Sequence, residues 1–266
     1  MSRIIAVTNQ KGGVGKTTTS VNLSASLAAM KRRVLLIDMD PQGNATMGSG
    51  IDKNNVEYSA CDVLLGDSSI QDAIFRDTDA GYDVLPGNAD LTAAEVGLME
   101  MEGREQQLRL ALEAVSEQYD YVLIDCPPSL NMLTINALVA SHGVLIPMQC
   151  EYYALEGLTA LLDTIEQIRS SVNEALEIEG LIRTMFDPRN NLANQVSSQL
   201  ILHFGDKVYR TLIPRNVRLA EAPSHGLPIL HYDKTSRGAL SYLALAGEVI
   251  RREEQRDHVE STPATA

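Results

Sequence analysis

Two lysines frame a run of glycines near the start of the chain. Glycines let backbone N–H groups turn toward a phosphate without a clash from Cβ. Lys16, at the end of this run, can reach the β- and γ-phosphates of a nucleotide, and the hydroxyl of Thr17 is a suitable ligand for Mg²⁺. The residues of this expected phosphate-binding loop are Lys11, Gly12, Gly13, Val14, Gly15, Lys16, Thr17 and Thr18.

Lys11 is the unusual member of this loop. The common spacing G-x-x-x-x-G-K-T would place a glycine at position 10, where this chain has Gln10. A glycine-rich turn with solvated lysines is the alternative interpretation. The order of an apolar run at 4–7, the loop and a helical pattern at 16–30 favours phosphate binding. Lys11 therefore needs a role of its own.

Apolar runs alternate with helical patterns along the chain, which is typical of a mostly parallel twisted sheet with helices on both faces. This is the α/β class to which P-loop NTPases belong. Ligands of such sheets lie at the carboxyl ends of the strands, so we expect the polar residues there to meet. The expected strands are 4–8, 34–37, 82–85, 121–124, 144–147 and 178–185, and the expected helices are 16–30, 104–117, 131–141 and 154–173.

Carboxylates follow two of the expected strands. Asp38 and Asp40 end the second one, where we expect them to share a face and to orient an attacking water or the water shell of a metal. Asp125 ends the fourth strand, ahead of Pro127 and Pro128, and is the expected partner of Mg²⁺ beside Thr17. For both positions the alternative is a polar strand end that enters a turn.

Composition limits the classes of protein that remain. No apolar run reaches the length of a transmembrane helix, and we expect no signal peptide. Cys61, Cys126 and Cys150 show no metal spacing, and each is expected to be a small buried residue. The net charge of −13 taken alone argues against nucleic acid. Residues 207–252 nevertheless carry eight basic and three acidic residues, a local charge of +5.

The organisation expected from this pattern is a single ATPase domain over residues 1–256. Residues 257–266 turn polar and end in Ser-Thr-Pro-Ala-Thr-Ala. We expect this short tail to be disordered.

Taken together, the motifs resemble the ParA/Soj family of chromosome- and plasmid-partitioning ATPases, within the MinD/ParA group of deviant Walker A, SIMIBI-type proteins. The resemblance covers nearly the whole chain. Three motifs are shared by the wider group, and the block IPRNVRLAEAPSHGLPI at 213–229 is the more specific one. The shared motifs are KGGVGKTTT at 11–19, VLLIDMDPQGNAT at 34–46 and YDYVLIDCPPSL at 119–130.

The resemblance implies roles for individual residues. Lys11 would reach across an ATP-bound homodimer to the phosphates of the other subunit, while Lys16 serves its own subunit. Asp40 would position the hydrolytic water, with Asp38 nearby, and Thr17 and Asp125 would serve Mg²⁺. Pro214 and Asn216 would contact adenine, although a simple turn is nearly as good an interpretation.

The resemblance also implies partners. Family members bind double-stranded DNA non-specifically as ATP dimers, and a ParB-type protein stimulates their otherwise slow hydrolysis. The protein would then be cytoplasmic and nucleoid-associated. The candidate DNA-binding residues are Arg189, Arg215, Arg218, Lys234, Arg237 and Arg251.

Two other functions stay open. A MinD-like membrane-associated ATPase should end in a basic amphipathic helix with large apolar anchors, which residues 251–258 lack. A nucleotide-switched scaffold with negligible turnover is disfavoured by the intact Asp40 and Asp125. A third function, an iron protein of the nitrogenase type, is disfavoured because no second suitable cysteine accompanies Cys126.

Overall fold

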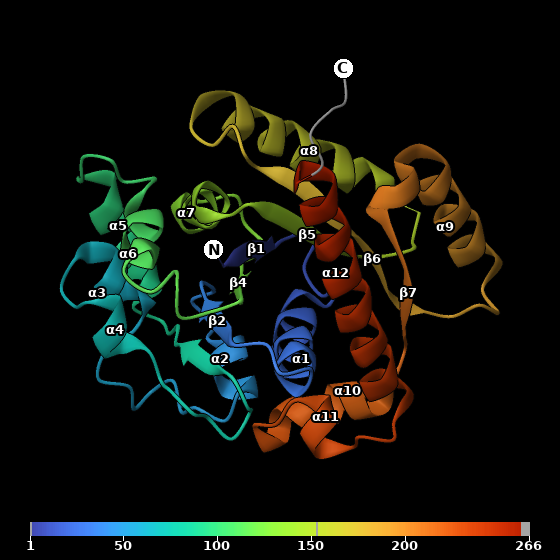
Figure 1. Ribbon diagram of the computed structural model, residues 1–266, viewed down its shortest axis with the longest axis horizontal. Coiled ribbons are helices and arrows are strands. Elements are labelled where there is room, and N and C mark those ends of the chain that lie inside the picture. Colours follow the sequence, from blue (N-terminus) through green and yellow to red (C-terminus); the bar gives the residue numbers. More distant parts are fainter. Residues whose placement is uncertain (1, 153, 262–266) are drawn as a thin grey trace.

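The computed structural model describes residues 2–152 and 154–261. Its centre is a seven-stranded sheet with the order β3-β2-β4-β1-β5-β6-β7, and all pairings between these strands are parallel. Figure 1 shows this twisted sheet between two layers of helices. The strands are β1 (Arg3–Val7), β2 (Val34–Asp38), β3 (Asp83–Leu85), β4 (Tyr121–Asp125), β5 (Gly143–Gln149), β6 (Glu177–Phe186) and β7 (Val208–Pro214).

Two hydrophobic clusters cover the two faces of the sheet. The first contains residues of the helices α3 (Ala60–Leu65), α4 (Ile70–Ala73), α5 (Leu91–Met99), α6 (Gln107–Glu113), α7 (Met132–Ala140), α8 (Ala154–Ser171) and α9 (Asn191–Phe204). The second contains residues of α1 (Lys16–Ala29), α2 (Asn44–Gly48), α10 (Val217–Glu221), α11 (Ile229–Tyr232) and α12 (Arg237–Ser261). Short 3₁₀ turns lie at Gly205–Lys207 and Ala222–His225.

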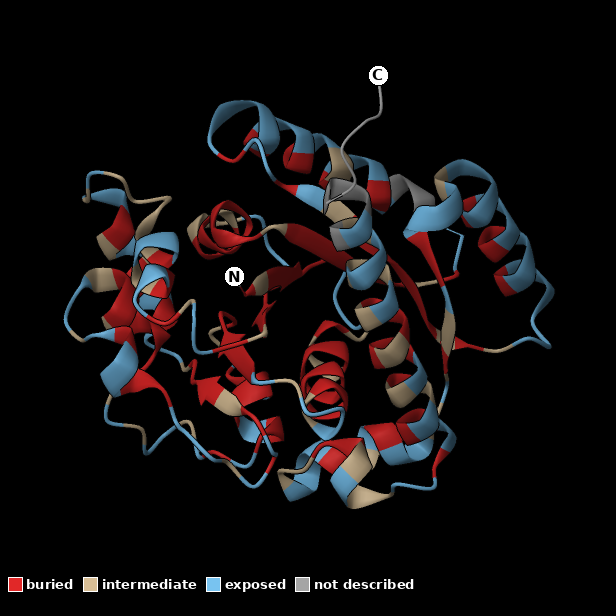
Figure 2. Cartoon of the chain, viewed as in Figure 1, coloured by how far each residue is buried: buried red, intermediate tan, exposed pale blue. Residues whose placement is uncertain are grey.

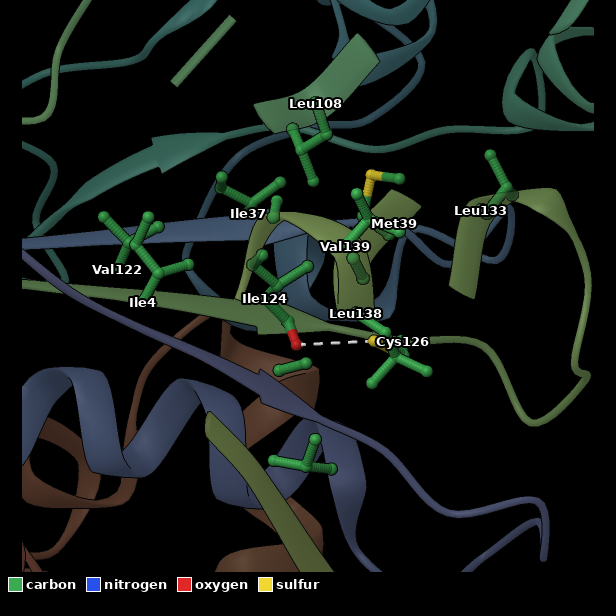
Figure 3. Packing of buried hydrophobic residues seen from close by; sticks show 14 of the residues in the cluster. Ile4, Ile37, Met39, Leu108, Val122, Ile124, Cys126, Leu133, Leu138 and Val139 are labelled. Atoms are coloured by element: carbon green, nitrogen blue, oxygen red, sulfur yellow. Dashed lines mark hydrogen bonds between the residues drawn. The ribbon is translucent and has the colours of Figure 1, made fainter. Parts of the chain in front are cut away.

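Alternation along each central strand explains why both clusters form. In β4, Val122 and Ile124 lie in the first cluster, while Tyr121 and Leu123 lie in the second. Successive side chains of a strand point to opposite faces, so a continuous apolar strand needs helices on both sides. Figure 3 shows Val122 and Ile124 packed in the first cluster, together with Cys126. All three cysteines are buried and free, as the sequence predicted.

Helix α1 is the most enclosed of the helices beside the phosphate loop. Figure 2 shows it almost wholly buried between the sheet and α12. Its interior serines satisfy their hydroxyls locally, since Ser24 and Ser26 each donate to the carbonyl four residues earlier. Small side chains such as Ala25 and these serines let the helix lie close to the sheet, which fixes the start of α1 against β1.

The sheet order places the loop before α1 at a switch point. β1 has β4 on one side and β5 on the other, so the chain leaves β1 where the strand order reverses. Ligands of open α/β sheets bind in the crevice outside the carboxyl ends of the strands at such a point. The fold therefore brings the ends of β1, β2, β4, β5 and β6 toward one site.

The six predicted strands and four predicted helices are confirmed, with α6 shorter than the expected 104–117. Strand β7 was not predicted. It carries polar side chains, ends in Pro214 and forms an edge, so it lacks the apolar run of a central strand. Helix α12 continues through Ser261, so the described part of the expected tail, 257–261, is helical. Residues 262–266 lie outside the described residues.

Candidate nucleotide-binding site

The phosphate loop joins the end of β1 to the start of α1 and is open on its outer side. Gly13 and Gly15 adopt φ values of 72° and 88°, which only glycine reaches without strain. A Cβ atom at Gly12 or Gly13 would meet no other atom within 4 Å. The backbone N–H groups of this loop and of the first turn of α1 are therefore accessible to an anion.

Side chains from neighbouring strands hold the loop at both ends. Asn9 donates to the carbonyl of Pro147 in β5 at 2.9 Å and accepts from the backbone N–H of Lys11 at 3.0 Å. Near the other end, Thr184 of β6 donates to the carbonyl of Val14 at 2.7 Å. Neither Asn9 nor Thr184 was predicted from the sequence, and Thr184 belongs to no motif that would have indicated it.

Lys16 is buried beneath the phosphate loop, and its role as a phosphate ligand stays a prediction. Its side chain is buried, and its ammonium donates to the carbonyl of Lys11 at 3.3 Å. Burial lowers the pKa of Lys16, and the nearby carboxylates of Asp125 and Asp40 oppose that shift. A cation held beside two carboxylates and below an open loop can pair with the phosphates of a nucleotide.

Thr17 and Asp125, the two predicted magnesium residues, are in direct contact. The hydroxyl of Thr17 donates to one carboxylate oxygen of Asp125 at 2.8 Å, and Ser20 donates to the other, also at 2.8 Å. Burial and the neighbouring charge of Asp38 raise the pKa of Asp125. Ser20 was not predicted, although it lies one turn after Thr17 on the same face of α1.

This donor set fits Mg²⁺. The ion prefers oxygen ligands and is usually held by one or two carboxylates together with phosphates and water. A hydroxyl and a buried carboxylate beside a phosphate loop supply those oxygens. Among the described residues, there is no group of three or more His, Cys, Asp and Glu side chains that would form a site by itself.

Asp38 and Asp40 lie in different surroundings, although the sequence predicted that they share one face of a strand. Strand β2 ends at Asp38, so the alternation expected to align the two carboxylates does not extend to Asp40. Asp38 is fully buried and accepts hydrogen bonds from Thr46 and from the backbone N–H of Asp40. Asp40 lies in the following turn, where its carboxylate accepts from the N–H of Gln42 at 2.9 Å. The catalytic role of Asp38 remains a prediction, and its geometry is that of an anchor for this turn.

Lys11 points away from its own loop. Its ammonium contacts a carboxylate oxygen of Glu151, just past β5, at 2.6 Å. Both side chains are close to half exposed. An exposed ion pair of this kind contributes little net free energy, so Lys11 can exchange Glu151 for another anion at small cost.

The predicted adenine contacts lie just past the sheet. Pro214 is paired with Phe186 at the end of β7, and Asn216 caps α10, where its carbonyl oxygen accepts from the N–H of Leu219 at 3.2 Å. The cap leaves the amide nitrogen of Asn216 to contact a base. Both residues stay predictions as adenine ligands.

The predicted DNA-binding cations fall into two electrostatic groups. Arg189 chelates Asp187 through two hydrogen bonds, and Arg218 pairs with Glu221 at 2.7 Å. Both arginines are therefore partly neutralised. In the described part of the chain, no ion pair involves the other four predicted cations, which are Arg215, Lys234, Arg237 and Arg251.

Arg251 is separated from the other three. Helix α12 runs antiparallel to β7, because Glu248 contacts the N–H groups of Arg210 and Thr211 while Arg252 contacts the earlier carbonyl of Val208. Arg237 thus lies near the carboxyl end of β7, and Arg251 lies about 21 Å further along the helix. Arg251 lines a wide cleft of about 1550 Å³ beside the start of the strands. Arg215, Lys234 and Arg237 are called the carboxyl-edge cations below.

No helix within residues 2–152 and 154–261 is both long enough and apolar enough to cross a membrane.

Comparison with known proteins agrees with this site. A family model described as an AAA domain matches residues 2–178, about two thirds of the chain. The chain is 57% identical over 249 residues to the sporulation initiation inhibitor protein Soj of Bacillus subtilis, covering 94% of this chain and 98% of Soj. It is 52% identical over 256 residues to the chromosome partitioning protein ParA of Caulobacter vibrioides, covering 96% of each.

A solved structure gives the same architecture with its ligands. The structure of cobyrinic acid a,c-diamide synthase from Mycobacterium smegmatis, with bound ADP and magnesium, has a TM-score of 0.84 and 38% identity to this chain, and the match covers 96% of each. The chain is thus an ATPase that uses ATP and Mg²⁺, and the phosphate loop, Thr17 and Asp125 stay the predicted residues of its site. On the family model, the identities and the fold together, the chain belongs to the ParA/Soj family of P-loop ATPases.

Proposed function

We propose that this ATPase dimerises when it binds ATP, holds DNA non-specifically in that state, and partitions a chromosome or plasmid together with a ParB-type partner. The observation that carries the DNA-binding part is the group of carboxyl-edge cations. On a chain with a net charge of −13, Arg215 follows the carboxyl end of β7, and Lys234 and Arg237 lie just before and at the start of α12, which packs against that strand.

Non-specific DNA binding requires only this kind of surface. Contacts to phosphates need cations at suitable spacing and read no bases. The acidic remainder of the chain repels DNA, so a single subunit binds weakly and two joined subunits bind better. Binding therefore depends on the nucleotide that joins them.

The position of Lys11 supports the dimer. Its ammonium is at the surface, held only by the exposed Glu151 among the ion pairs of the described residues. Two ATP molecules enclosed between two subunits bring several negative charges to that surface. Lys11 of each subunit then exchanges Glu151 for the phosphates of the other.

A DNA titration tests the proposal. Binding of a fluorescent duplex of arbitrary sequence is measured with ATP, with ADP and without nucleotide, for the wild type and for Lys16→Ala. We expect salt-sensitive binding with ATP only, and its loss in Lys16→Ala. Arg109→Glu on α6 is a matched control for charge-reversal variants, because Arg109 is exposed and lies near His142, before the amino end of β5, whereas the nucleotide site is at the carboxyl ends of the strands. Equal binding in all three nucleotide states would contradict the proposal.

The same assay separates the two alternatives. A MinD-like membrane ATPase would bind anionic vesicles with ATP and leave DNA free. A nucleotide-switched scaffold would bind its partner without measurable phosphate release. Cytoplasmic location at the nucleoid follows from the proposal and is checked by imaging a fluorescent fusion with and without Lys16→Ala.

A further inference from the structure

We propose that Thr184 is a positioning residue of the ATPase, which sets the orientation of the phosphate loop and couples it to the segment 186–190. The hydroxyl of Thr184 donates to the carbonyl of Val14 at 2.7 Å across 170 residues of sequence. Thr184 is 2% exposed and Val14 is 1% exposed. The bond is therefore shielded from water, and its loss leaves a buried carbonyl without that donor.

This bond fixes one peptide plane of the loop. All peptide bonds of the described residues are trans, so the carbonyl of Val14 and the N–H of Gly15 point in opposite directions from the same plane. Thr184 holds the carbonyl toward β6. The N–H of Gly15 is thereby held away from β6, in a loop whose backbone N–H groups bind phosphate.

Gly15 needs this external support. Its φ is 88°, and glycine adopts positive φ values about as readily as negative ones. The residue therefore has no intrinsic preference for the observed orientation. A Cβ on Gly15 would lie 3.8 Å from Thr184 and 3.9 Å from the methyl of Met185. The side chains of Thr184 and Met185 thus lie next to Gly15.

The chain that follows Thr184 leads directly to candidate DNA contacts. Met185 has a φ of 47°, one of three positive values among the described non-glycine residues. Phe186 then pairs with Pro214 of β7, and Asp187 holds Arg189. A cavity of about 160 Å³ beside this segment is lined by Glu151, Asp187 and Arg215, among others. Only Met185 separates Thr184 from the segment 186–190.

A shift of the Val14 carbonyl when phosphate binds is therefore transmitted through Thr184 to this segment. Met185 lies in the left-handed region that disfavours residues other than glycine, so the bend that follows Thr184 is strained. The coupling rests on the proposed DNA binding. The positioning role does not, because it concerns the nucleotide alone.

The first experiment measures the positioning role. Thr184→Val removes the hydroxyl at nearly constant volume, Thr184→Ser keeps it, and Thr164→Val removes another buried threonine hydroxyl on the distant α8. Mg-ADP affinity and ATPase kinetics are recorded, with thermal unfolding of the nucleotide-free protein. We expect Thr184→Val to raise the Kd and the KM for ATP about fivefold with little change in kcat, from the loss of one hydrogen bond.

The comparison between variants distinguishes positioning from general destabilisation. Thr184→Ser should bind Mg-ADP within about twofold of the wild type, since its hydroxyl retains the hydrogen bond to the carbonyl of Val14. If Thr184→Val merely reduces the fraction of folded protein, the apparent kcat falls while the KM for ATP is unchanged. That result overturns the proposal. Thr184→Ala serves where the valine variant does not fold. Wild-type affinity for Mg-ADP in Thr184→Val and in Thr184→Ala also overturns the proposal.

The second experiment measures the coupling at saturating ATP. DNA affinity with ATP is divided by DNA affinity without nucleotide, for the wild type, Thr184→Val and Thr164→Val. We expect this ratio to fall in Thr184→Val alone. A wild-type ratio in Thr184→Val overturns the coupling and leaves the positioning role. A ratio of one in the wild type rejects the proposed DNA switch itself and leaves the nucleotide result intact.

Discussion

The hydroxyl of Thr17, at the start of α1, donates a hydrogen bond to Asp125, at the end of β4, at 2.8 Å. The two residues are 108 positions apart in the chain, and the parallel pairing of β1 with β4 brings them together. Ser20 occupies the second oxygen of the same carboxylate. The fold thus presents one hydroxyl and one carboxylate in contact beside the phosphate loop, where we expect Mg²⁺ to bind with the nucleotide.

Replacing Asp125 by Asn should abolish magnesium-dependent turnover without loss of stability. The amide carries no charge to attract the ion, and the fully buried carboxylate costs free energy to ionise in the nucleotide-free protein. We expect kcat to fall by roughly 100-fold or more, as for loss of a metal that stabilises developing charge.

Phosphate release and urea unfolding check this prediction. Removal of Mg²⁺ from the wild type with EDTA should reproduce the kinetic defect. Ser24→Ala, another buried change on α1, serves as the control and should keep its metal dependence. Full activity of Asp125→Asn in excess Mg²⁺ would contradict the assignment.

The two aspartates that follow β2 should separate in their effects. Asp40→Ala should lower hydrolysis by about 10²-fold or more, in the range of lost general acid–base or water-positioning groups, while nucleotide binding persists. Asp38→Ala should instead lower the free energy of unfolding by roughly 1–3 kcal/mol, because it leaves the buried N–H groups of Thr46 and Asp40 without the carboxylate that accepts from them.

Phosphate release and urea unfolding are measured for Asp40→Ala and for Asp38→Ala. The scaffold alternative predicts equally negligible release for the wild type and Asp40→Ala. A stable Asp38→Ala variant with no turnover would restore the catalytic role that the sequence suggested for Asp38.

The ion pairs of the basic residues predict a ranking for DNA affinity. Arg215→Glu should weaken ATP-dependent DNA binding more than Arg189→Glu, because Arg189 already shares its charge with Asp187 while Arg215 has no ion pair in the described residues. The slope of log affinity against log salt should fall by about 1 for each phosphate contact removed.

Both variants should still dimerise with ATP, which light scattering reports. Arg109→Glu should behave as the wild type. The ranking is wrong if Arg189→Glu has the larger effect, which would mean that DNA displaces Asp187 from Arg189.

Glu179 should make the protein sensitive to acid. This carboxylate lies at the start of β6, is 3% exposed, and accepts hydrogen bonds from Arg3 and Arg256. Burial raises its pKa, but the hydrogen bonds and charges of Arg256 and Arg3 outweigh burial and lower the pKa to about 2. The folded pKa is below the ordinary value, so the stabilisation is complete above about pH 4.5 and is lost as the pH falls toward 2.

This lowering of the pKa of Glu179 corresponds to about 3 kcal/mol of folding stability at neutral pH. The free energy of unfolding of Glu179→Gln should therefore be lower than that of the wild type at pH 7, and the difference should vanish toward pH 2. Glu177→Gln is the neighbouring control, since its contact with Lys207 is exposed and 3.9 Å long. A pH-independent difference between Glu179→Gln and the wild type would contradict this account.

Strong apolar runs made much of the fold predictable. The central strands are apolar on both faces, so each reads as a continuous run, and the helices between them follow from their spacing. Strand β7 was not predicted, because an edge strand has fewer buried positions and therefore a weaker apolar pattern. Its N–H groups at Arg210 and Thr211 donate to Glu248 of α12 in place of a further strand. The proximity of Lys16, Thr17 and Asp125 was predictable, because phosphate and magnesium chemistry restrict the residue types at the ends of β1 and β4.

The supporting residues were not predictable. Thr184, Ser20 and Asn9 are ordinary polar residues whose importance depends on which strand end lies beside the loop. The predicted alignment of Asp40 with Asp38 was also wrong, because β2 ends two residues before Asp40. Such contacts depend on strand order and on where each strand stops, which local sequence does not encode.

By itself the sequence determined the chemistry: a phosphate loop with an extra lysine, a carboxylate after each of two buried strands, and a basic segment on an acidic chain. These depend on residue type and short spacing, which the chain fixes directly. Only the tertiary structure decided which groups touch. It joined Thr17 to Asp125, committed Asp38 to Thr46, paired Arg189 with Asp187 and moved Arg251 away from the carboxyl-edge cations. Packing of the sheet and α12 sets those distances, because residues far apart in the chain meet only where the strand order and helix direction bring them together.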